Sequence, residues 1–281
     1  MVEGWTWDES LFAGAAAYYR RGRLPYAPGL AAALAEELGL DGRGRLLDVG
    51  CGPGTLAVLL GGSFAEVVGV DPDAGMIAEA QRAAEAAGPA GRVRWVRARA
   101  EQLPSDLGEF DAVTFGHSFH WMDQERVAVA VRELLRPGGA FVHVADWKAE
   151  RRSVAGLPHP VPPQPAVDGL VRRYLGPLRR AGQGVLPHGT PGGEAEVLAR
   201  AGYAGPSRLV VPGGQVLELD AGDLVARTFS TSSSAPHLFG PHLPAFEADL
   251  RALLQAASPS GLFAERLPGT EVRIWRTAGP R

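Results

Sequence analysis

A glycine-rich segment between a predicted strand and a predicted helix has the residue types needed to hold a small charged ligand. Residues 46–55 read LLDVGCGPGT, and glycine is favoured where the backbone takes a positive φ or approaches a ligand closely. The helix that follows begins with backbone N–H groups that have no partner within the helix. Gly52, Gly54 and Ala57 also satisfy the dinucleotide-binding pattern G-x-G-x-x-G/A. The glycine spacing alone therefore does not select one cofactor.

Two carboxylates narrow the choice of cofactor. Asp48 lies at the end of the first predicted strand, where it would repel a pyrophosphate but suit a cofactor with an ammonium group and a sulfonium. Asp71 ends the second predicted strand and could hold a ribose of either cofactor. Together with Gly50, Gly52 and Gly54, these two carboxylates fit S-adenosylmethionine better than NAD. An NAD-dependent oxidoreductase remains an alternative.

The elements around this segment predict an α/β fold. Short apolar runs, read as strands, lie at 45–49, 67–70, 93–96, 110–115 and 140–145. The helices predicted around them cover 29–38, 55–61, 73–87 and 124–135. Strands that are separated by single helices imply right-handed crossovers and a parallel sheet. The carboxyl ends of such strands form one edge, where ligands of open α/β sheets bind.

The second half of the chain departs from this pattern. Residues 151–192 contain eight prolines, and a loop-rich stretch of this length in a compact domain is usually a lid or a binding element. We therefore expect a single domain over residues 1–281. Its cofactor-binding core would cover 46–146, and insertions at 151–192 and 213–268 would form a substrate cap. Within the second insertion, residues 230–244 are predicted to be a polar loop.

Five segments follow one another in an order that is typical of one enzyme family. They are LLDVGCGPGT (46–55), VVGVDPDAGMI (67–77), RAEQLP (99–104), FDAVTFGHSFHWMD (110–123) and LLRPGGAFV (134–142). In these segments the chain resembles the class I S-adenosylmethionine-dependent methyltransferases, and its FHW piece is similar to the subgroup of trans-aconitate and small-molecule methyltransferases. The resemblance implies a Rossmann-like, doubly wound, mostly parallel seven-stranded sheet with an antiparallel last strand and a helical and loop cap. A late strand at 272–275 fits this expectation.

The resemblance also implies a set of cofactor-binding residues. They are Tyr19, Arg21, Asp48, Gly50, Cys51, Gly52, Asp71, Pro72, Met76, Ala100, Glu101 and His117. In this set Asp71 would bind the ribose diol, and Arg21 would pair with the carboxylate of S-adenosylmethionine. Arg99 stands where many members have an aspartate. Because arginine cannot accept a hydrogen bond, the Ala100 backbone or the Glu101 carboxylate would take the adenine amino group.

Methyl transfer requires little chemistry from protein side chains. The enzyme must hold the nucleophile, the methyl group and the sulfur in line, and it can remove a proton from the acceptor. His117 and His120 follow the fourth predicted strand and are the candidate catalytic residues, because histidine is the natural base near neutral pH. Four aromatic side chains are expected to line a partly apolar acceptor pocket: Trp121, Trp147, Phe229 and Phe239.

Composition weighs against several other function classes. The net charge of −3 does not suit a protein held on nucleic acid by bulk charge. Cys51 is the one cysteine, and the sequence has no C-x-x-C or H-E-x-x-H motif, so we expect no disulfide framework and no metal. No apolar run is long enough to span a bilayer or to form a secretory signal. We expect a cytoplasmic enzyme with a small-molecule acceptor and no nucleic-acid or membrane partner; the oligomeric state is not predicted. A non-catalytic partner or regulatory protein that binds S-adenosylmethionine is the alternative.

Overall fold

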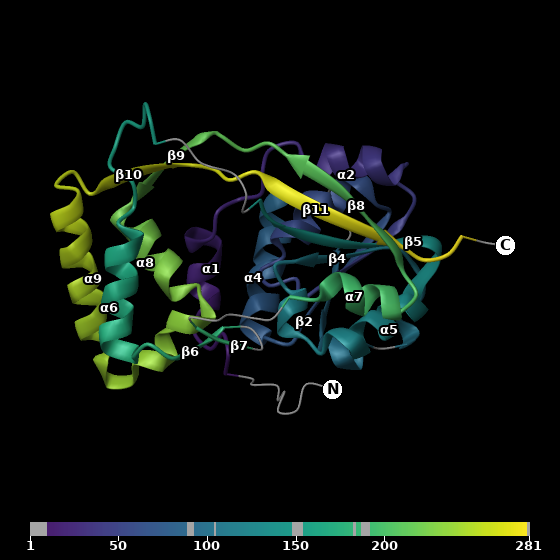
Figure 1. Ribbon diagram of the computed structural model, residues 1–281, viewed down its shortest axis with the longest axis horizontal. Coiled ribbons are helices and arrows are strands. Elements are labelled where there is room, and N and C mark those ends of the chain that lie inside the picture. The colour runs from purple at the N-terminus through teal and green to yellow at the C-terminus, as the bar shows by residue number, and fades with distance from the viewer. Residues whose placement is uncertain are drawn as a thin grey trace.

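The computed structural model describes residues 10–88, 93–103, 105–147, 154–181, 184–186 and 192–279. Within these residues, seven strands form one sheet in the order β3-β2-β1-β4-β5-β11-β8 (Figure 1). The strands are β1 (Arg45–Val49), β2 (Glu66–Asp71), β3 (Val93–Arg97), β4 (Phe110–Gly116), β5 (Leu135–Asp146), β8 (Ala204–Val211) and β11 (Thr270–Arg276). The strands from β1 to β5 pair in parallel, and β11 runs antiparallel to both of its neighbours. The expected Rossmann-like sheet with an antiparallel last strand is confirmed.

The strand order reverses next to β1, which pairs with β2 on one side and with β4 on the other. Asp48 is the register partner of Gly69 in β2 and of Thr114 in β4. The crossover helices on either side of this point leave a crevice at the carboxyl ends of the strands, where ligands of doubly wound sheets bind. The topology therefore places the glycine-rich segment and Asp48 at the expected ligand edge.

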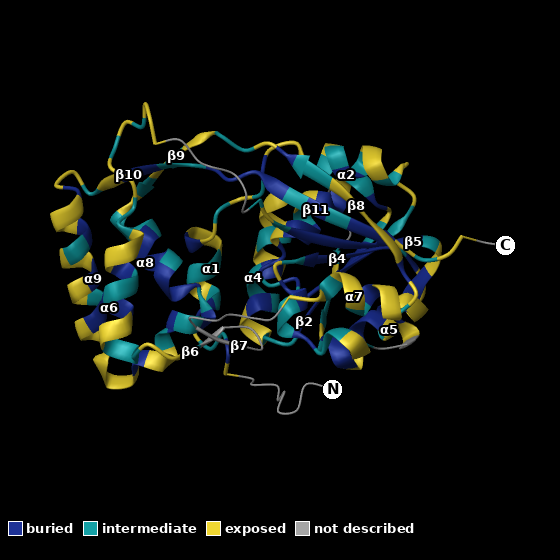
Figure 2. Ribbon diagram, in the orientation of Figure 1, coloured by how far each residue is buried: buried dark blue, intermediate teal, exposed yellow. Residues whose placement is uncertain are grey.

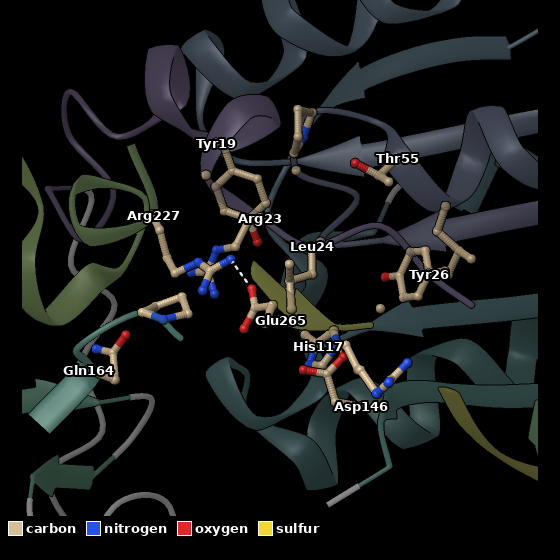
Figure 3. Close-up of a pocket in the computed structure, with 18 of the residues that line it drawn as sticks. Tyr19, Arg23, Leu24, Tyr26, Thr55, His117, Asp146, Gln164, Arg227 and Glu265 are labelled. Carbon is tan, nitrogen blue, oxygen red and sulfur yellow. Dashed lines mark hydrogen bonds and ion pairs between the residues drawn. The ribbon is translucent and has the colours of Figure 1, made fainter. Parts of the chain in front are cut away.

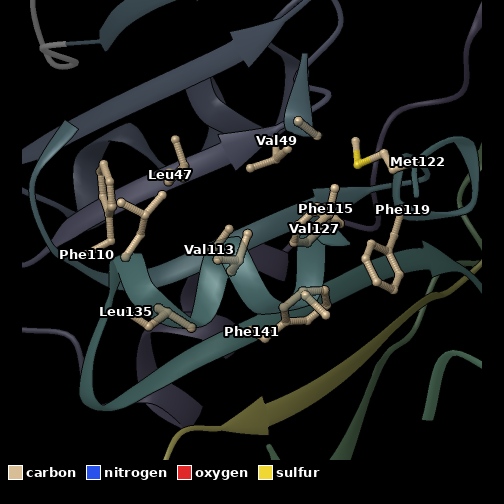
Figure 4. Close-up of a cluster of buried hydrophobic side chains, with 14 of the residues drawn as sticks. Leu47, Val49, Phe110, Val113, Phe115, Phe119, Met122, Val127, Leu135 and Phe141 are labelled. Atoms are coloured by element: carbon tan, nitrogen blue, oxygen red, sulfur yellow. The ribbon is translucent and has the colours of Figure 1, made fainter. Parts of the chain in front are cut away.

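Helices cover both faces of this sheet. They are α2 (Leu30–Leu38), α3 (Thr55–Leu60), α4 (Ala74–Ala87), α5 (Gln124–Leu134) and α7 (Glu194–Arg200). Successive residues of a strand point to opposite faces, so Leu46 belongs to one buried cluster and Leu47 to the other. Figure 4 shows the cluster that contains Leu47, where Phe115 and Phe141 stack with their ring centroids 4.5 Å apart. Burial of both faces explains why these strands read as continuous apolar runs.

A helical lobe lies at the other end of the long axis of the molecule (Figure 1). It contains α6 (Gln164–Leu175), α8 (Ala221–Phe229) and α9 (Leu243–Ala257), with the hairpin of β6 (Arg179–Ala181) and β7 (Gly184–Leu186) beside them. Its helices enclose their own apolar cluster, in which Phe239 stacks on Phe246 with the ring centroids 4.0 Å apart. Figure 2 shows that the inward sides of these helices are buried. We call this lobe the cap.

A strand ribbon and the N-terminal segment tie the cap to the sheet. The antiparallel strands β9 (Val216–Asp220) and β10 (Leu262–Arg266) form a ribbon between them, because β9 follows β8 and β10 precedes β11 in the chain. The short helix α1 (Ala16–Gly22) packs on α8, where a Cβ added to Gly22 would lie 2.4 Å from the carbonyl carbon of Ala226. The N-terminal segment is therefore held against the cap by close backbone contact.

The structure differs from the sequence-based expectation in the cap and in the ribbon that leads to it. Residues 230–244 are not an exposed polar loop: they form η5 (Ser232–Ser234) and η6 (Pro236–His242), and Phe239 is buried. Local hydrogen bonds satisfy the hydroxyl groups of this segment, as when Ser234 donates to the Thr228 carbonyl at 2.6 Å. The strands β6, β7, β9 and β10 are not among the predicted strands. Parts of the first insertion, at 151–153, 182–183 and 187–191, lie outside the described residues. No helix in the described ranges has the length and apolar character needed to cross a membrane.

Candidate active site

Two cavities of similar size meet at the carboxyl edge of the sheet. The first, which we call the loop cavity, encloses about 650 Å³ and is lined by the segments that follow β1, β2, β3 and β4. The second, the cap cavity, encloses about 640 Å³ between the β1 loop, the N-terminal segment and the cap. Five residues line both cavities: Tyr19, Gly50, Gly52, Gly116 and His117. A ligand in one cavity would therefore lie in direct reach of a ligand in the other.

The glycines of the β1 loop have two separate physical roles. Gly50, Gly52 and Gly54 all have positive φ, at 65°, 53° and 76°. A Cβ added to Gly50 would lie 2.6 Å from the Ser118 side chain, and one added to Gly54 would lie 2.5 Å from the Trp95 ring. A Cβ on Gly52 would meet nothing within 4 Å, so this glycine serves the backbone conformation and leaves open space beside the loop.

Asp71 lies in the loop cavity, where its carboxylate is fixed by the backbone. One carboxylate oxygen accepts the Gly52 N–H at 2.9 Å and the other accepts the Asp73 N–H at 2.9 Å. Burial raises the pKa of Asp71 to about 6, although these two hydrogen bonds act against that rise. Each oxygen can accept a further hydrogen bond, so the carboxylate can receive two hydroxyl donors. This is the arrangement that a vicinal diol requires.

Asp48 lines the cap cavity and is almost fully buried. The Thr114 hydroxyl donates to Oδ1 at 2.8 Å. The Ala57 N–H faces the carboxylate, but no donor in the described part of the chain meets hydrogen-bond geometry at Oδ2. Burial raises the pKa of Asp48 to about 7, against the opposing effect of the Thr114 hydrogen bond. A cationic ligand beside Asp48 would supply the missing partner and favour the ionised form.

The far end of the loop cavity is suited to a flat ring. Ala100 and Glu101 lie in η2 (Ala100–Gln102) and line this end. The rings of Phe12 and Trp121, which line the same cavity, pack edge to face with their centroids 5.4 Å apart. The Glu101 carboxylate accepts the backbone N–H of Asp123 at 3.0 Å, which ties η2 to the start of α5. Glu101 therefore supports the wall of the cavity as well as facing it.

Cys51 lines the cap cavity, and Pro72 and Met76 line the loop cavity. The backbone N–H of Cys51 donates to the Val70 carbonyl at 3.0 Å. The Cys51 thiol is turned towards Gly69, since a Cβ added to Gly69 would lie 3.2 Å from the Cys51 Sγ. Burial raises the pKa of this thiol well above its usual value. The side chain of Cys51 is thus a small packing group under the loop.

Arg21 is the one predicted cofactor-binding residue that the described lining of both cavities does not include. Its guanidinium pairs with Asp220 at 2.8 Å and with Asp223 at 2.7 Å, at the start of α8. Arg23 lines the cap cavity instead, 4.9 Å from the centre of the Tyr19 ring, and donates to the Ser230 carbonyl at 2.9 Å. The helix ends at Gly22 and the backbone becomes extended at Arg23, so two arginines that are close in sequence point to different sides.

His117 lies where the two cavities meet and has an unusual backbone. It is the one non-glycine residue with positive φ in the described ranges, at 53°, and its N–H donates to the Val144 carbonyl at 3.0 Å. Its Nε2 is 3.4 Å from the Asp146 carboxylate, and its ring stacks at 18° to the Tyr26 ring (Figure 3). Backbone strain of this kind is characteristic of functional positions. The strain here turns the imidazole towards both cavities.

Other predicted residues lie elsewhere. His120 lies in η4 (Phe119–Trp121) against the Trp121 ring and is not part of the described lining of either cavity. Trp121 lines the loop cavity and not the cap cavity. The expectation that Phe229 and Phe239 line an acceptor pocket is wrong, because both rings are buried in the apolar cluster of the cap. Trp147 does not contribute to the described lining.

The cap end of the second cavity carries paired charges. Arg227 of α8 forms an ion pair with Glu265 of β10 across the cavity wall, and Gln164 lies near this pair (Figure 3). The rest of this wall is largely apolar, with Leu24, Val154, Leu157, Val161 and Pro162. No group of three metal-ligating side chains occurs among the described residues. Sequence reasoning missed Tyr26, Arg23, Arg227 and Glu265, because their segments are far apart in the chain and carry no motif.

Comparison with known proteins relates this site to methyl transfer. A family model described as a methyltransferase domain matches residues 46–139. A demethylmenaquinone methyltransferase of Thermus thermophilus is 34% identical over 166 residues, which are 57% of this chain and 74% of that protein. A 2-phytyl-1,4-naphtoquinone methyltransferase of Trichormus variabilis is 36% identical over 95 residues, 32% of this chain and 42% of that protein. The solved structure of the 4+2-cyclase SpnF shares the fold with a TM-score of 0.55 and 19% identity, over 96% of this chain and 95% of its own.

Proposed function

The chain belongs to the class I S-adenosylmethionine-dependent methyltransferases, and on that premise we propose that it methylates a small organic acceptor bound in the cap cavity. The observation that carries this proposal is the shared wall of the two cavities at Gly116 and His117. A cofactor in the loop cavity would present its methyl group through this junction, and an acceptor in the cap cavity would face it. Holding two reactants in one geometry is the main contribution that such an enzyme makes.

Residues of the loop cavity, together with Asp48 and Arg23 of the adjoining cap cavity, fit S-adenosylmethionine in charge. Asp71 would bind the ribose hydroxyls, and Asp48, whose Oδ2 has no hydrogen-bond partner in the described structure, would face the cationic methionine end. Arg23 would pair with the methionine carboxylate in place of Arg21. Ala100 and Glu101 would lie at the adenine. The bound cofactor supplies an electrophilic methyl group on a sulfonium, and these side chains position it.

The cap cavity supports an acceptor that is partly apolar and carries one polar group. Aliphatic side chains form most of the cap wall, and the ion pair of Arg227 and Glu265 offers both hydrogen-bond donors and acceptors at its end. The two relatives are named as methyltransferases of demethylmenaquinone and of 2-phytyl-1,4-naphtoquinone, which supports a small-molecule acceptor.

His117 is the residue placed to remove a proton from an oxygen or nitrogen acceptor. It faces both cavities, and the Asp146 carboxylate 3.4 Å away would orient the ring and stabilise the imidazolium that forms. His120 is not on the described lining, so it is not assigned this role. The step assigned to the protein is therefore proton removal by Nδ1 of His117, since Nε2 faces Asp146, while the methyl group passes in line to the acceptor.

Binding and turnover together test this function. Calorimetric titration should give dissociation constants on the order of micromolar for S-adenosylmethionine and S-adenosylhomocysteine. It should show no binding of NAD. Incubation with methyl-labelled S-adenosylmethionine and a panel of small acceptors, reduced naphthoquinones included, should then transfer the label. His117→Asn, which tolerates positive φ, should lower kcat about 100-fold, and the matched His120→Asn should not. Binding without label transfer to any acceptor would favour a non-catalytic protein.

A further inference from the structure

Tyr26 lies in the cap cavity beside its junction with the loop cavity, although no motif marks it. It follows α1 in the N-terminal segment, lines the cap cavity and stacks on His117 with ring centroids 6.3 Å apart (Figure 3). A Cβ added to Gly116 would lie 2.5 Å from the Tyr26 hydroxyl oxygen. Gly116 lines both cavities, so this close approach places the hydroxyl at their common wall.

The surroundings of the Tyr26 hydroxyl keep it neutral and available. No hydrogen bond joins its Oη to another residue in the described part of the chain. Burial raises the pKa of Tyr26 well above its usual value, and the charges of Asp48 and Asp146 raise it further, while Arg23 lowers it slightly. A neutral phenol of this kind keeps an oxygen lone pair that is free to accept a weak hydrogen bond from a polarised C–H group.

We infer that the Tyr26 hydroxyl oxygen is a catalytic contact to the sulfonium-bound methyl group, which it holds on the line between the loop cavity and the acceptor. This inference rests on the proposed function. The methyl hydrogens of a sulfonium carry partial positive charge, so they are stronger C–H donors than those of a neutral thioether. The new bond to the acceptor forms as the carbon–sulfur bond breaks, and its electron pair stays on sulfur. Tyr26 keeps its proton throughout.

The inference predicts that Tyr26 distinguishes two ligands that differ by one methyl group. Tyr26→Phe keeps the ring and its stacking on His117 but removes the oxygen. We expect calorimetry to show S-adenosylmethionine bound about fivefold more weakly by this variant and S-adenosylhomocysteine bound with unchanged affinity. The proton resonance of methyl-labelled S-adenosylmethionine should move upfield in the complex with the variant, because the deshielding oxygen is lost.

Tyr174→Phe is the matched control. It also removes a phenol hydroxyl, one that donates to Asp249 at 2.9 Å on the cap surface and lines neither cavity in the described structure. It should change neither affinity nor the methyl resonance. An unchanged ratio of the two affinities in Tyr26→Phe, or an equal loss for both ligands, would overturn the inference while the proposed function stands. If the wild-type protein binds neither ligand, the proposed function fails and this inference fails with it.

Discussion

The loop cavity and the cap cavity have nearly the same volume but are built in different ways. The walls of the loop cavity come mainly from the carboxyl ends of β1, β2 and β4 and the segment after β3, and backbone groups hold the key side chains in place. The walls of the cap cavity combine the β1 loop with α1, α6, α8, β10 and the residues near them. A topology shared by a whole family fixes the first cavity, whereas side-chain packing between distant segments fixes the second.

This comparison predicts that damage to the cap core leaves the loop cavity able to bind. Phe246 is fully buried between Phe229 and Phe239. Phe246→Ala should lower the free energy of unfolding by about 3–5 kcal/mol, because it removes a buried ring and leaves a cavity. Chemical denaturation would measure this loss. Calorimetry well below the unfolding transition should still give an affinity for S-adenosylhomocysteine within about twofold of the wild type.

Phe141→Ala is the counterpart in the sheet lobe, where Phe141 stacks on Phe115 below the ligand edge. It should lower the free energy of unfolding by a similar amount and should also lower the affinity for S-adenosylhomocysteine. If the two variants weaken binding equally, the two cavities depend on one cooperative core and the comparison does not hold.

Asp48→Asn tests the charge at the junction. Asparagine can still accept from Thr114, so the change removes charge without removing that hydrogen bond. We expect affinity for S-adenosylmethionine to fall about 10- to 100-fold in calorimetry, as for a lost contact to a charged group. Wild-type affinity should rise as pH increases through about 7, where Asp48 ionises, and the variant should lose this dependence. An affinity that is independent of pH in the wild type would contradict the assignment.

The ionised carboxylate of Asp48 should favour cofactor binding but lower the stability of the ligand-free protein. The pKa of Asp48 in the folded protein, about 7, lies above its ordinary value of 3.8, so the folded state binds the proton more tightly than the unfolded state. The contribution of Asp48 to stability therefore decreases as pH rises from about 4 to about 7. Above that range, ligand-free Asp48→Asn should unfold at a higher temperature than the wild type in a thermal scan. A lower Tm would show that the buried charge is compensated in the folded protein.

Arg23 and Arg21 allow a smaller, paired test at the boundary of the two cavities. Arg23→Gln should lower the affinity for both S-adenosylmethionine and S-adenosylhomocysteine about tenfold, because both ligands carry the methionine carboxylate. Arg21→Gln should leave both affinities unchanged and lower stability only slightly, since its ion pairs with Asp220 and Asp223 are exposed. A larger loss of affinity in Arg21→Gln than in Arg23→Gln would assign the methionine carboxylate to Arg21.

Cys51 should show the smallest effect. Its thiol packs under the loop while its backbone N–H bonds to Val70, so Cys51→Ala should change cofactor affinity by less than about twofold. Because burial raises the pKa of the thiol, the wild-type protein should react slowly with thiol reagents near neutral pH. Rapid labelling, or a large loss of affinity in the variant, would mean that the side chain faces the ligand.

The sequence predicted the ligand edge of the sheet well, because the residues there follow strands whose order is set by local patterns. Asp48, Asp71 and the loop glycines lie within 30 residues of one another, and each ends or follows a predicted strand. The same reasoning also selected Arg21 and His120, which the described lining of the two cavities does not include. Arg21 turns away because the helix ends one residue after it, and His120 lies one short turn beyond the strand end. A shift of one or two residues at the end of an element changes the side that a side chain faces.

The sequence by itself determined the parallel sheet, the position of the ligand edge and the charge presented there, because hydrophobic periodicity and glycine conformation act over short segments. Only the tertiary structure decided which residues form the cap cavity. Tyr26, His117, Arg227 and Glu265 come from four separate segments, and packing of α1 on α8 and of β9 on β10 brings them together. Contacts between segments far apart in the chain depend on how surfaces fit in three dimensions, and no local pattern encodes that fit.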